Sequence, residues 1–125
     1  MKKTPYEITL DEERRIVRLV VKGELSKTVG EQAITEVRTK AMGNKYNIFC
    51  DVRHAKVRAS FSDWFYMPRN LEIYKTTKGL KTTILITKGK QEEEYNFFEN
   101  VAYNLGINIK IFYEEQDAFE WLETS

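Results

Sequence analysis

The side chains that could take part in catalysis are few in this sequence. His54 is the only histidine and Cys50 the only cysteine, so the usual zinc sites built from several such ligands cannot form. A Ser-His-Asp triad would need a serine held on a sharp turn, and no Gly-x-Ser-x-Gly motif is present. Phosphate-binding loops and dinucleotide fingerprints are also missing. We therefore predict no catalytic residue, no metal site and no cofactor.

Two carboxylates are the nearest approach to a catalytic pair. Glu24 and Asp51 lie at the carboxyl edge of the predicted sheet and could act there as acid and base, with His54 nearby. The simpler interpretation is structural, with Asp51 capping backbone amides or pairing with Arg53. Cys50 lies in an apolar run, which favours a small buried thiol over a reactive nucleophile.

A basic loop followed by an aromatic helix is the most unusual local composition. Residues 53–58 read Arg-His-Ala-Lys-Val-Arg and could receive a phosphate, an acidic partner or a lipid headgroup, although a solvated loop is the simpler interpretation. Residues 61–67 read Phe-Ser-Asp-Trp-Phe-Tyr-Met. Because neighbouring helical residues point about 100° apart, one helix face cannot bury all five large side chains. The candidate interaction surface comprises Arg53, His54, Arg58, Trp64, Phe65, Tyr66 and Arg69.

Length and charge restrict the class of protein. The 125 residues fit a single domain over residues 1–125. With 20 basic against 19 acidic residues, a general affinity for nucleic acid is not expected. No run approaches the roughly 18 apolar residues that cross a membrane. The start of the chain lacks the apolar stretch of a signal peptide, and a lone cysteine forms no intrachain disulfide, so we expect a cytoplasmic protein.

Hydrophobic periodicity predicts an α/β framework for these side chains. Strands are expected at residues 6–10, 16–21, 46–52, 82–87 and 107–111. The first two are joined by a short polar link, which predicts an antiparallel hairpin.

Helices are expected between the later strands. The first begins at Ser26 or at Thr28 and directs charged residues such as Arg38 largely away from its apolar face. The second follows a polar loop over residues 53–60, is capped by Ser60 or Ser62, and is kinked or restarted at Pro68. The last two helices cover residues 90–105 and the segment from residue 114 onward.

The predicted element order is β-β-α-β-α-β-α-β-α. After the first strand come four βα units, and each crossover should be right-handed and parallel. We therefore expect an α/β fold with a mostly parallel five-stranded sheet whose first strand is antiparallel.

Several segments on these elements carry a family resemblance. They are the strand end Cys50-Asp51-Val52-Arg53-His54-Ala55, the later Pro68-Arg69-Asn70-Leu71, and the closing Ile109-Lys110-Ile111-Phe112-Tyr113 with Ala118-Phe119-Glu120-Trp121-Leu122. Together they resemble the STAS-like families, especially the uncharacterised group similar to the sporulation anti-sigma-factor antagonist. The resemblance implies a STAS-like fold in a bacterial binding or regulatory domain.

The resemblance also implies a place to look for a phosphorylation switch. True antagonists carry a phosphorylatable serine or threonine beside an aspartate, after the central strand. Here Val52 and Arg53 follow Asp51, so that hydroxyl is missing. Ser60 and Ser62 lie nearby, and Ser62 is equally well explained as a helix cap.

Three functions remain open. The favoured one is a non-enzymatic regulatory or protein-interaction domain, whose partner is another protein or a second copy in a homodimer. The alternative is a carrier of a small apolar ligand or lipid in a groove between the second and third helices, because the broad fold also resembles lipid-carrying domains of the Sec14 type. An enzyme using Asp51 and His54 is the least favoured.

Overall fold

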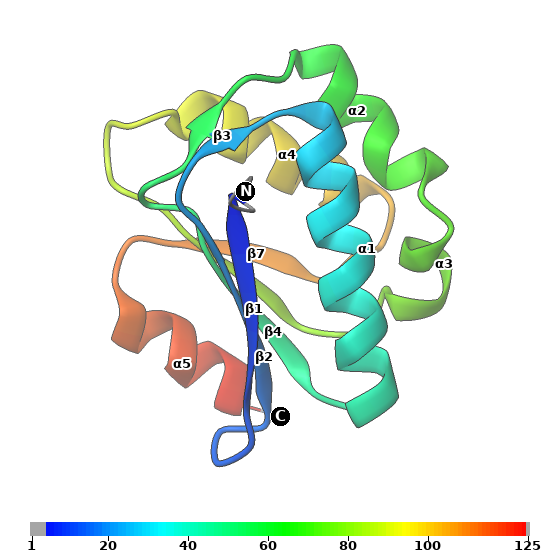
Figure 1. Cartoon of the computed structure of the whole chain (residues 1–125), viewed down its shortest axis with the longest axis vertical. Helices are drawn as coiled ribbons and strands as arrows, with labels where there is room; N and C mark the ends of the chain where they lie inside the picture. Colours follow the sequence, from blue (N-terminus) through cyan, green and yellow to red (C-terminus); the bar gives the residue numbers. More distant parts are fainter. Residues whose placement is uncertain (1–4, 125) are drawn as a thin grey trace, which may run out of the picture.

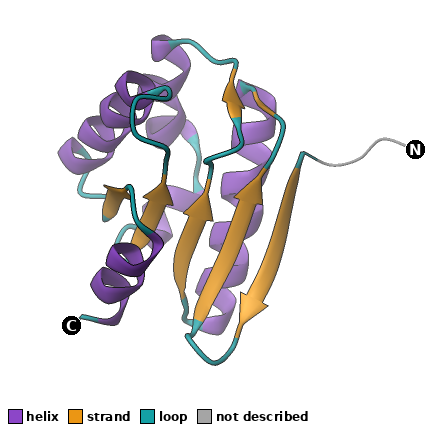
Figure 2. Cartoon of the chain, turned by 90° about the vertical axis from the view of Figure 1, so that its left-hand side faces the viewer, coloured by secondary structure: helices purple, strands orange, loops and turns teal. Residues whose placement is uncertain are grey.

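A five-stranded sheet forms the centre of the computed structural model, which describes residues 5–124 (Figures 1 and 2). Its strands are β1 (Tyr6–Asp11), β2 (Ile16–Val21), β4 (Asn47–Asp51), β6 (Thr82–Leu85) and β7 (Ile109–Phe112). The spatial order is β1-β2-β4-β6-β7, with β1 antiparallel to β2 and every other pairing parallel. The predicted α/β class and the antiparallel first strand are confirmed. The expectation about a signal peptide falls partly on residues 1–4, outside the described residues.

Five helices flank the sheet within residues 5–124. They are α1 (Lys27–Asn44), α2 (Phe61–Asn70), α3 (Ile73–Thr77), α4 (Glu92–Asn104) and α5 (Glu115–Glu123). Among the described residues, no helix is long and apolar enough to cross a membrane.

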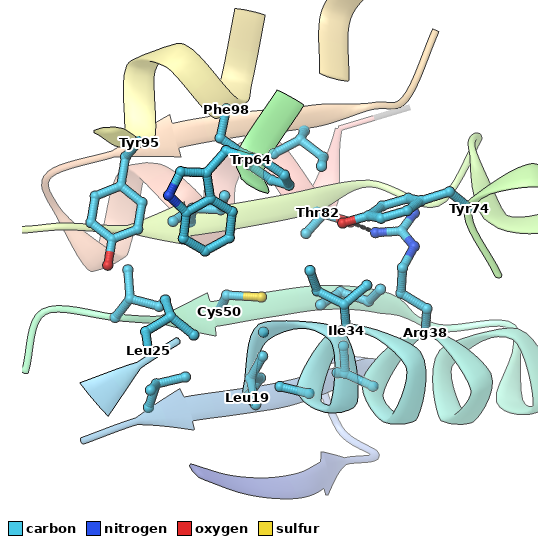
Figure 3. A pocket seen from close by; sticks show the side chains of 18 of the residues that line it. Leu19, Leu25, Ile34, Arg38, Cys50, Trp64, Tyr74, Thr82, Tyr95 and Phe98 are labelled. Carbon is cyan, nitrogen blue, oxygen red and sulfur yellow. Dashed lines mark hydrogen bonds between the residues drawn. The ribbon is translucent and has the colours of Figure 1, made fainter. Parts of the chain in front are cut away.

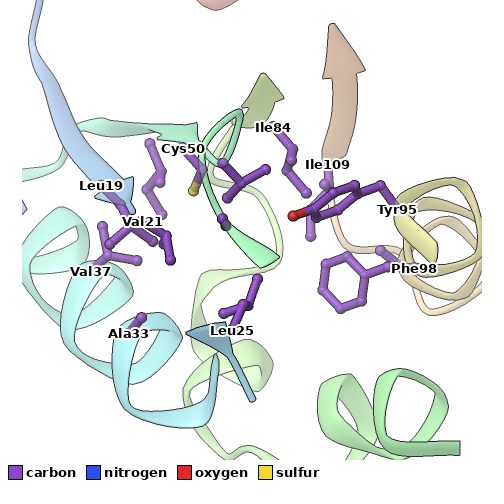
Figure 4. Close-up of a cluster of buried hydrophobic side chains, with 14 of the residues drawn as sticks. Leu19, Val21, Leu25, Ala33, Val37, Cys50, Ile84, Tyr95, Phe98 and Ile109 are labelled. Carbon is purple, nitrogen blue, oxygen red and sulfur yellow. The ribbon is translucent and has the colours of Figure 1, made fainter. Parts of the chain in front are cut away.

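Alternation along the strands divides the core into two layers. On β4, Ile48 and Cys50 belong to the cluster formed with α1, α2 and α4 (Figure 4). Phe49 points to the opposite face, where its ring stacks on Phe119 of α5 at 4.7 Å. Successive strand residues face opposite sides, so a strand that is apolar throughout is buried on both faces.

A second, two-stranded sheet differs from the sequence prediction. Residues 53–60 were expected to form a loop, but β5 (Lys56–Val57) pairs in parallel with β3 (Glu24–Leu25). The Gln91 side chain accepts a hydrogen bond from the Val57 amide at 3.0 Å. Two-residue strands are too short to produce a detectable period, which explains why the pattern does not reveal them.

Side-chain caps fix where the two helices next to this small sheet begin. Ser26 caps α1 by accepting from the Val29 amide at 3.2 Å, so the cap is the first of the two predicted candidates. Ser60 and Asp63 form a reciprocal capping box on α2, with hydrogen bonds of 3.0 and 3.1 Å. Ser60, rather than Ser62, is therefore the cap.

The break in the second predicted helix lies later than expected. Pro68 is inside α2, and the helix continues to Asn70 before Leu71 turns to an extended conformation. The second helical segment, α3, starts only at Ile73. Pro68 lacks an amide hydrogen but is buried against the core, so packing keeps it inside the helix.

Candidate functional site

The predicted surface residues lie in three separate places. Arg53 and His54 follow the carboxyl end of β4, and Arg58 lies between β5 and α2. Phe65, Tyr66 and Arg69 lie on the exposed side of α2, whereas Trp64 is turned inward. The structure therefore brings together only part of the predicted set.

Arg53 is engaged by Asp51 at the carboxyl end of β4. Its Nε donates to Oδ1 at 3.0 Å, its Nη2 to Oδ2 at 2.8 Å, and its backbone amide to Oδ1 at 3.1 Å. Burial alone would raise the pKa of the Asp51 carboxyl, but the hydrogen bonds from Arg53 outweigh it and hold the pKa below its ordinary value. Asp51 thus has the structural role that was favoured over a catalytic one.

Two further residues that could take part in chemistry, Glu24 and Cys50, are engaged in an ion pair or buried. Glu24 forms an exposed ion pair with Arg58 at 3.5 Å. The Cys50 thiol is buried, and burial raises its pKa to about 12. At neutral pH the reactive thiolate is therefore scarce. His54 is exposed beside this region.

The exposed side of α2 carries a cluster of aromatic groups. Phe61, Phe65 and Tyr66 are 43%, 37% and 54% exposed. The Phe65 and Tyr66 rings meet edge to face at 5.1 Å, and the Arg69 guanidinium lies 3.8 Å over the Phe65 ring. Arg69 also donates to the Phe65 carbonyl at 2.7 Å. We call these four residues, Phe61, Phe65, Tyr66 and Arg69, the outer face of α2.

Trp64 does not belong to that surface, which corrects the prediction. Its side chain is only 5% exposed and packs edge to face on Phe98 at 5.6 Å. Trp64, Met67 and Pro68 have the three- and four-residue spacing that lies on one side of a helix, and all three are buried. The neighbouring Phe65 and Tyr66 are rotated away from the core by the same geometry.

Trp64 instead lines a cavity of about 70 Å³ between the sheet and the helices α1–α4 (Figure 3). Its walls are mainly apolar and include Leu19, Ile34, Cys50 and Phe98. The predicted groove lay between the second helix and the helix over residues 90–105, and the cavity observed there is also lined by α1, α3 and the sheet.

Two buried polar atoms at this cavity have no hydrogen-bond partner in the described residues. They are the indole Nε1 of Trp64 and the hydroxyl of Tyr95. Figure 3 shows the two side chains next to each other at one end. Burial raises the pKa of Tyr95, and the Glu94 carboxylate raises it further, so the hydroxyl keeps its proton. Both groups are thus unpaired donors that lie within the cavity wall, with almost no surface of their own open to the cavity.

Arg38 lies at the other end of the cavity (Figure 3). Its Nε and Nη1 donate to the hydroxyls of Thr77 and Thr82 at 2.8 and 3.0 Å, and Nη2 donates to the Thr77 carbonyl at 2.6 Å. The guanidinium lies 4.6 Å from the centre of the Tyr74 ring. Burial lowers the pKa of Arg38.

Sequence reasoning missed Arg38 and Tyr95 as site residues. Arg38 was expected largely off the apolar face of α1, yet it follows Ile34 by four residues and shares its side of the helix. The spacing of Tyr95, Phe98 and Val101 places Tyr95 in the apolar stripe of the helix predicted over residues 90–105. A tyrosine in such a stripe needs a partner for its hydroxyl, and that requirement was the available signal.

No cluster of three or more histidine, cysteine or acidic side chains that could hold a metal ion occurs within residues 5–124. The cavity and the outer face of α2 are two candidate binding features among the described residues.

Comparison with known proteins identifies the fold. No family model matches the chain, and none of the curated proteins does. A crystal structure from Shewanella loihica, of an uncharacterised protein of the DUF3478 family with a SpoIIAA-like fold, matches 98% of this chain and 97% of its own length. The TM-score is 0.62 and the sequence identity 18%. The chain therefore has a SpoIIAA-like fold, which confirms the predicted STAS-like resemblance; an identity this low carries nothing about activity.

Proposed function

We propose that this chain is a non-enzymatic interaction domain that binds a protein partner on the outer face of α2. The observation that carries the proposal is the exposure of Phe61, Phe65 and Tyr66 on one short helix. Apolar groups gathered on a surface mark interaction sites more often than single exposed side chains do, and aromatic and arginine residues are enriched in such contacts.

Charge near this face indicates the chemistry of the partner. Arg69 lies on the face itself, and Arg58, which forms an exposed ion pair with Glu24 at 3.5 Å, precedes α2 by three residues. The nearest acidic side chain of the helix, Asp63, is engaged in the capping box. We therefore propose a partner segment that presents an apolar side chain flanked by carboxylates.

The absence of an activated group among the described residues supports binding over catalysis. Asp51 is held by Arg53, and the Cys50 thiol is buried with a raised pKa. The missing hydroxyl after Asp51 further supports a domain that works without the phosphorylation switch of the antagonists. In addition, the hydroxyl of nearby Ser60 accepts a hydrogen bond from the Asp63 amide and so serves as the cap of α2.

Paired variants test the binding surface. Phe65→Ser with Tyr66→Ser should abolish recovery of the partner in a quantitative affinity isolation. Tyr103→Ser is the matched control, because Tyr103 is an 80% exposed aromatic on α4 and does not belong to the outer face of α2. Recovery should also fall as salt rises, because the proposed contact includes charge. Equal recovery with the α2 double variant and the control would contradict the proposal.

A second function, carriage of a small apolar ligand, is favoured by the cavity. The cavity is mainly apolar and is lined by residues of four helices. Native mass spectrometry of freshly isolated protein should then show a co-purified small molecule. An apo mass, with no thermal stabilisation by any apolar compound tried, would refute this second function.

A further inference from the structure

The two edges of the five-stranded sheet differ in whether their outward main-chain groups are already paired. β1 forms one edge and β7 the other (Figure 2). We propose that the edge of β1 binds an extended, basic segment of a partner protein, which joins the sheet as a further strand. This surface is separate from the outer face of α2, so the inference does not depend on the proposed function.

The hydrogen bonds of the β1–β2 hairpin show which main-chain groups of β1 point outward. The Lys22 amide donates to the Pro5 carbonyl at 2.9 Å, one position before the first pair of the ladder. Hydrogen-bonded and non-hydrogen-bonded pairs alternate in an antiparallel ladder. The residues of β1 that bond to β2 are therefore Glu7, Thr9 and Asp11. The residues whose amides and carbonyls point away from β2 are Tyr6, Ile8 and Leu10, which we call the outward residues.

The edge of β1 is open along its length. Among the described residues, no strand pairs with β1 on the side away from β2. The strand is six residues long and contains neither proline nor lysine, the residues that commonly protect a sheet edge. An added strand could exchange main-chain hydrogen bonds with each outward residue. Extended peptides bind exposed sheet edges in this way.

The opposite edge, β7, is already occupied. The Ile109 amide donates to the carbonyl two residues earlier in the chain at 3.0 Å, and the Ile111 amide donates to Glu99 Oε2 of α4 at 2.8 Å. These amides point outward, because the alternate residues face β6, as with the Phe112 carbonyl, which accepts from the Ile86 amide at 3.0 Å. Only the β1 edge therefore offers unpaired outward amides along a strand of the described sheet.

A groove beside this edge is acidic. It is open, runs along α1 next to Tyr6, and is lined by Glu31 and Glu36, with Lys40 as the only cation in its lining. Burial and the neighbouring Glu36 carboxylate raise the pKa of the Tyr6 hydroxyl. A negative potential along the edge would favour the approach of a positively charged segment.

The opposite face of β1 adds a further carboxylate. Glu7 is exposed and forms no ion pair within residues 5–124, including with Lys22, which lies two residues beyond its partner on β2. Asp11 lies on the same face but pairs with Arg14 at 4.0 Å. A lysine or arginine opposite Glu7 would therefore meet an unpaired charge, and opposite charges across two strands are stabilising.

These charges favour a basic segment over a second copy of this chain. β1 carries two acidic residues and no basic one, so pairing two copies would bring like charges together. The expected segment alternates, with basic residues on the Glu7 face and apolar residues on the other face. There an apolar side chain would cover Leu10, which is 45% exposed.

Two alternating peptides test the inference. We would titrate the ¹⁵N-labelled protein with an eight-residue Lys-Val repeat and with the matching Glu-Val repeat, and the Lys-Val peptide should bind at least tenfold more tightly at low salt. At saturation, the amides of the outward residues should exchange with solvent at least tenfold more slowly. The amides of Glu7, Thr9 and Asp11 should change less than threefold, because they already bond to β2.

Variants separate strand pairing from charge. Ile8→Pro removes the central outward amide and should weaken Lys-Val binding at least tenfold, since an edge strand tolerates proline where its amide faces solvent. Ile8→Ala keeps that amide and should bind within threefold of wild type. Glu7→Lys should reverse the preference between the peptides, whereas Glu13→Lys, the same change in the hairpin turn, should not. Phe65→Ser with Tyr66→Ser should leave both affinities unchanged.

Thermal melting checks that each variant is folded, and the exchange measurement on the wild type decides the matter if Ile8→Pro is not. Binding of neither peptide, or equal affinities for the two, would overturn the inference. Lys-Val binding without slower exchange at the outward residues would reduce it to adsorption by surface charge. Sedimentation that shows a dimer of the wild type, lost in Ile8→Pro, would assign the edge to a second copy.

Discussion

The guanidinium of Arg38 joins three elements of the fold. It belongs to α1, and it donates hydrogen bonds to Thr77 of α3 and Thr82 of β6. Its side chain is only 1% exposed. A buried charge is tolerated only when its donors are satisfied, so this residue positions α1 and α3 around one end of the cavity.

Loss of Arg38 should therefore destabilise the protein strongly. Arg38→Ala removes three hydrogen bonds from a charged group and leaves the Thr77 and Thr82 oxygens without this donor. We expect a loss of at least about 2 kcal/mol in the free energy of unfolding measured in urea. Arg58→Ala, which removes only an exposed ion pair with Glu24, is the control and should change it little. Equal effects of the two substitutions would refute the role given to Arg38.

The Asp51–Arg53 pair should make the free energy of unfolding depend on pH in the acidic range. The pKa of Asp51 is lower in the folded protein than in the unfolded chain, where it is about 3.9. The Asp51 carboxylate therefore stabilises the folded protein at pH values above its pKa in the unfolded chain. This stabilisation is lost as the pH falls through the pKa of Asp51 in the folded protein. Asp51→Asn should therefore flatten the decline in stability below about pH 4. Parallel pH–stability curves for the two proteins would contradict this assignment.

Helix α2 has one face buried against the core and one face exposed to solvent. Trp64 and Met67 face the core, whereas Phe65 and Tyr66 are exposed. The helix starts at the Ser60–Asp63 capping box, which fixes its amino end beside β5. The residue at which α2 begins and the rotation of α2 about its own axis together decide which aromatic side chains reach solvent and which line the cavity.

The cap can be tested with two neighbouring serines. Ser60→Ala should lower the free energy of unfolding by about 1 kcal/mol, because the Asp63 amide loses its acceptor. Ser62→Ala should be nearly neutral, because Ser62 is exposed and Ser60 is the N-cap. Chemical denaturation of both variants measures the difference. A larger loss from Ser62→Ala would mean that the helix begins elsewhere.

The elements could be predicted from the sequence to different degrees. Long periodic segments, such as the strand ending at Asp51 and the helix containing Tyr95, are detectable because their patterns extend over several residues. The pair β3–β5 is too short for a pattern. The continuation of α2 through Pro68 depends on burial that only tertiary packing supplies.

The candidate site was less predictable than the fold for the same reason. The excess of aromatic residues over 61–67 correctly indicated that some would be exposed, but the sequence did not say which. Trp64 was wrongly placed on the surface because the rotation of α2 depends on where its cap lies. Arg38 was missed because its partners, Thr77 and Thr82, are about forty residues away in sequence.

At the scale of the whole molecule, the two layers of the core are unequal. Helices α1, α2 and α4 contribute to the layer that contains the cavity, whereas α5 packs on the opposite face (Figures 1 and 2). The proposed partner surface is the outer side of a helix whose inner side lines the cavity. The SpoIIAA-like fold therefore places both candidate binding features on one side of the sheet, and we propose that a distinct protein binds the outer face of α2 on this side.

Site-specific photo-cross-linking from α2 tests that claim most directly. A benzophenone amino acid would replace Tyr66 on the outer face of α2 or, as the control, the 80% exposed Tyr103 on α4. We predict one dominant adduct with a distinct protein from position 66, competed by unlabelled wild-type chain, and no such adduct from position 103. An adduct only with a second copy of this chain, or the same adducts from both positions, would contradict the account.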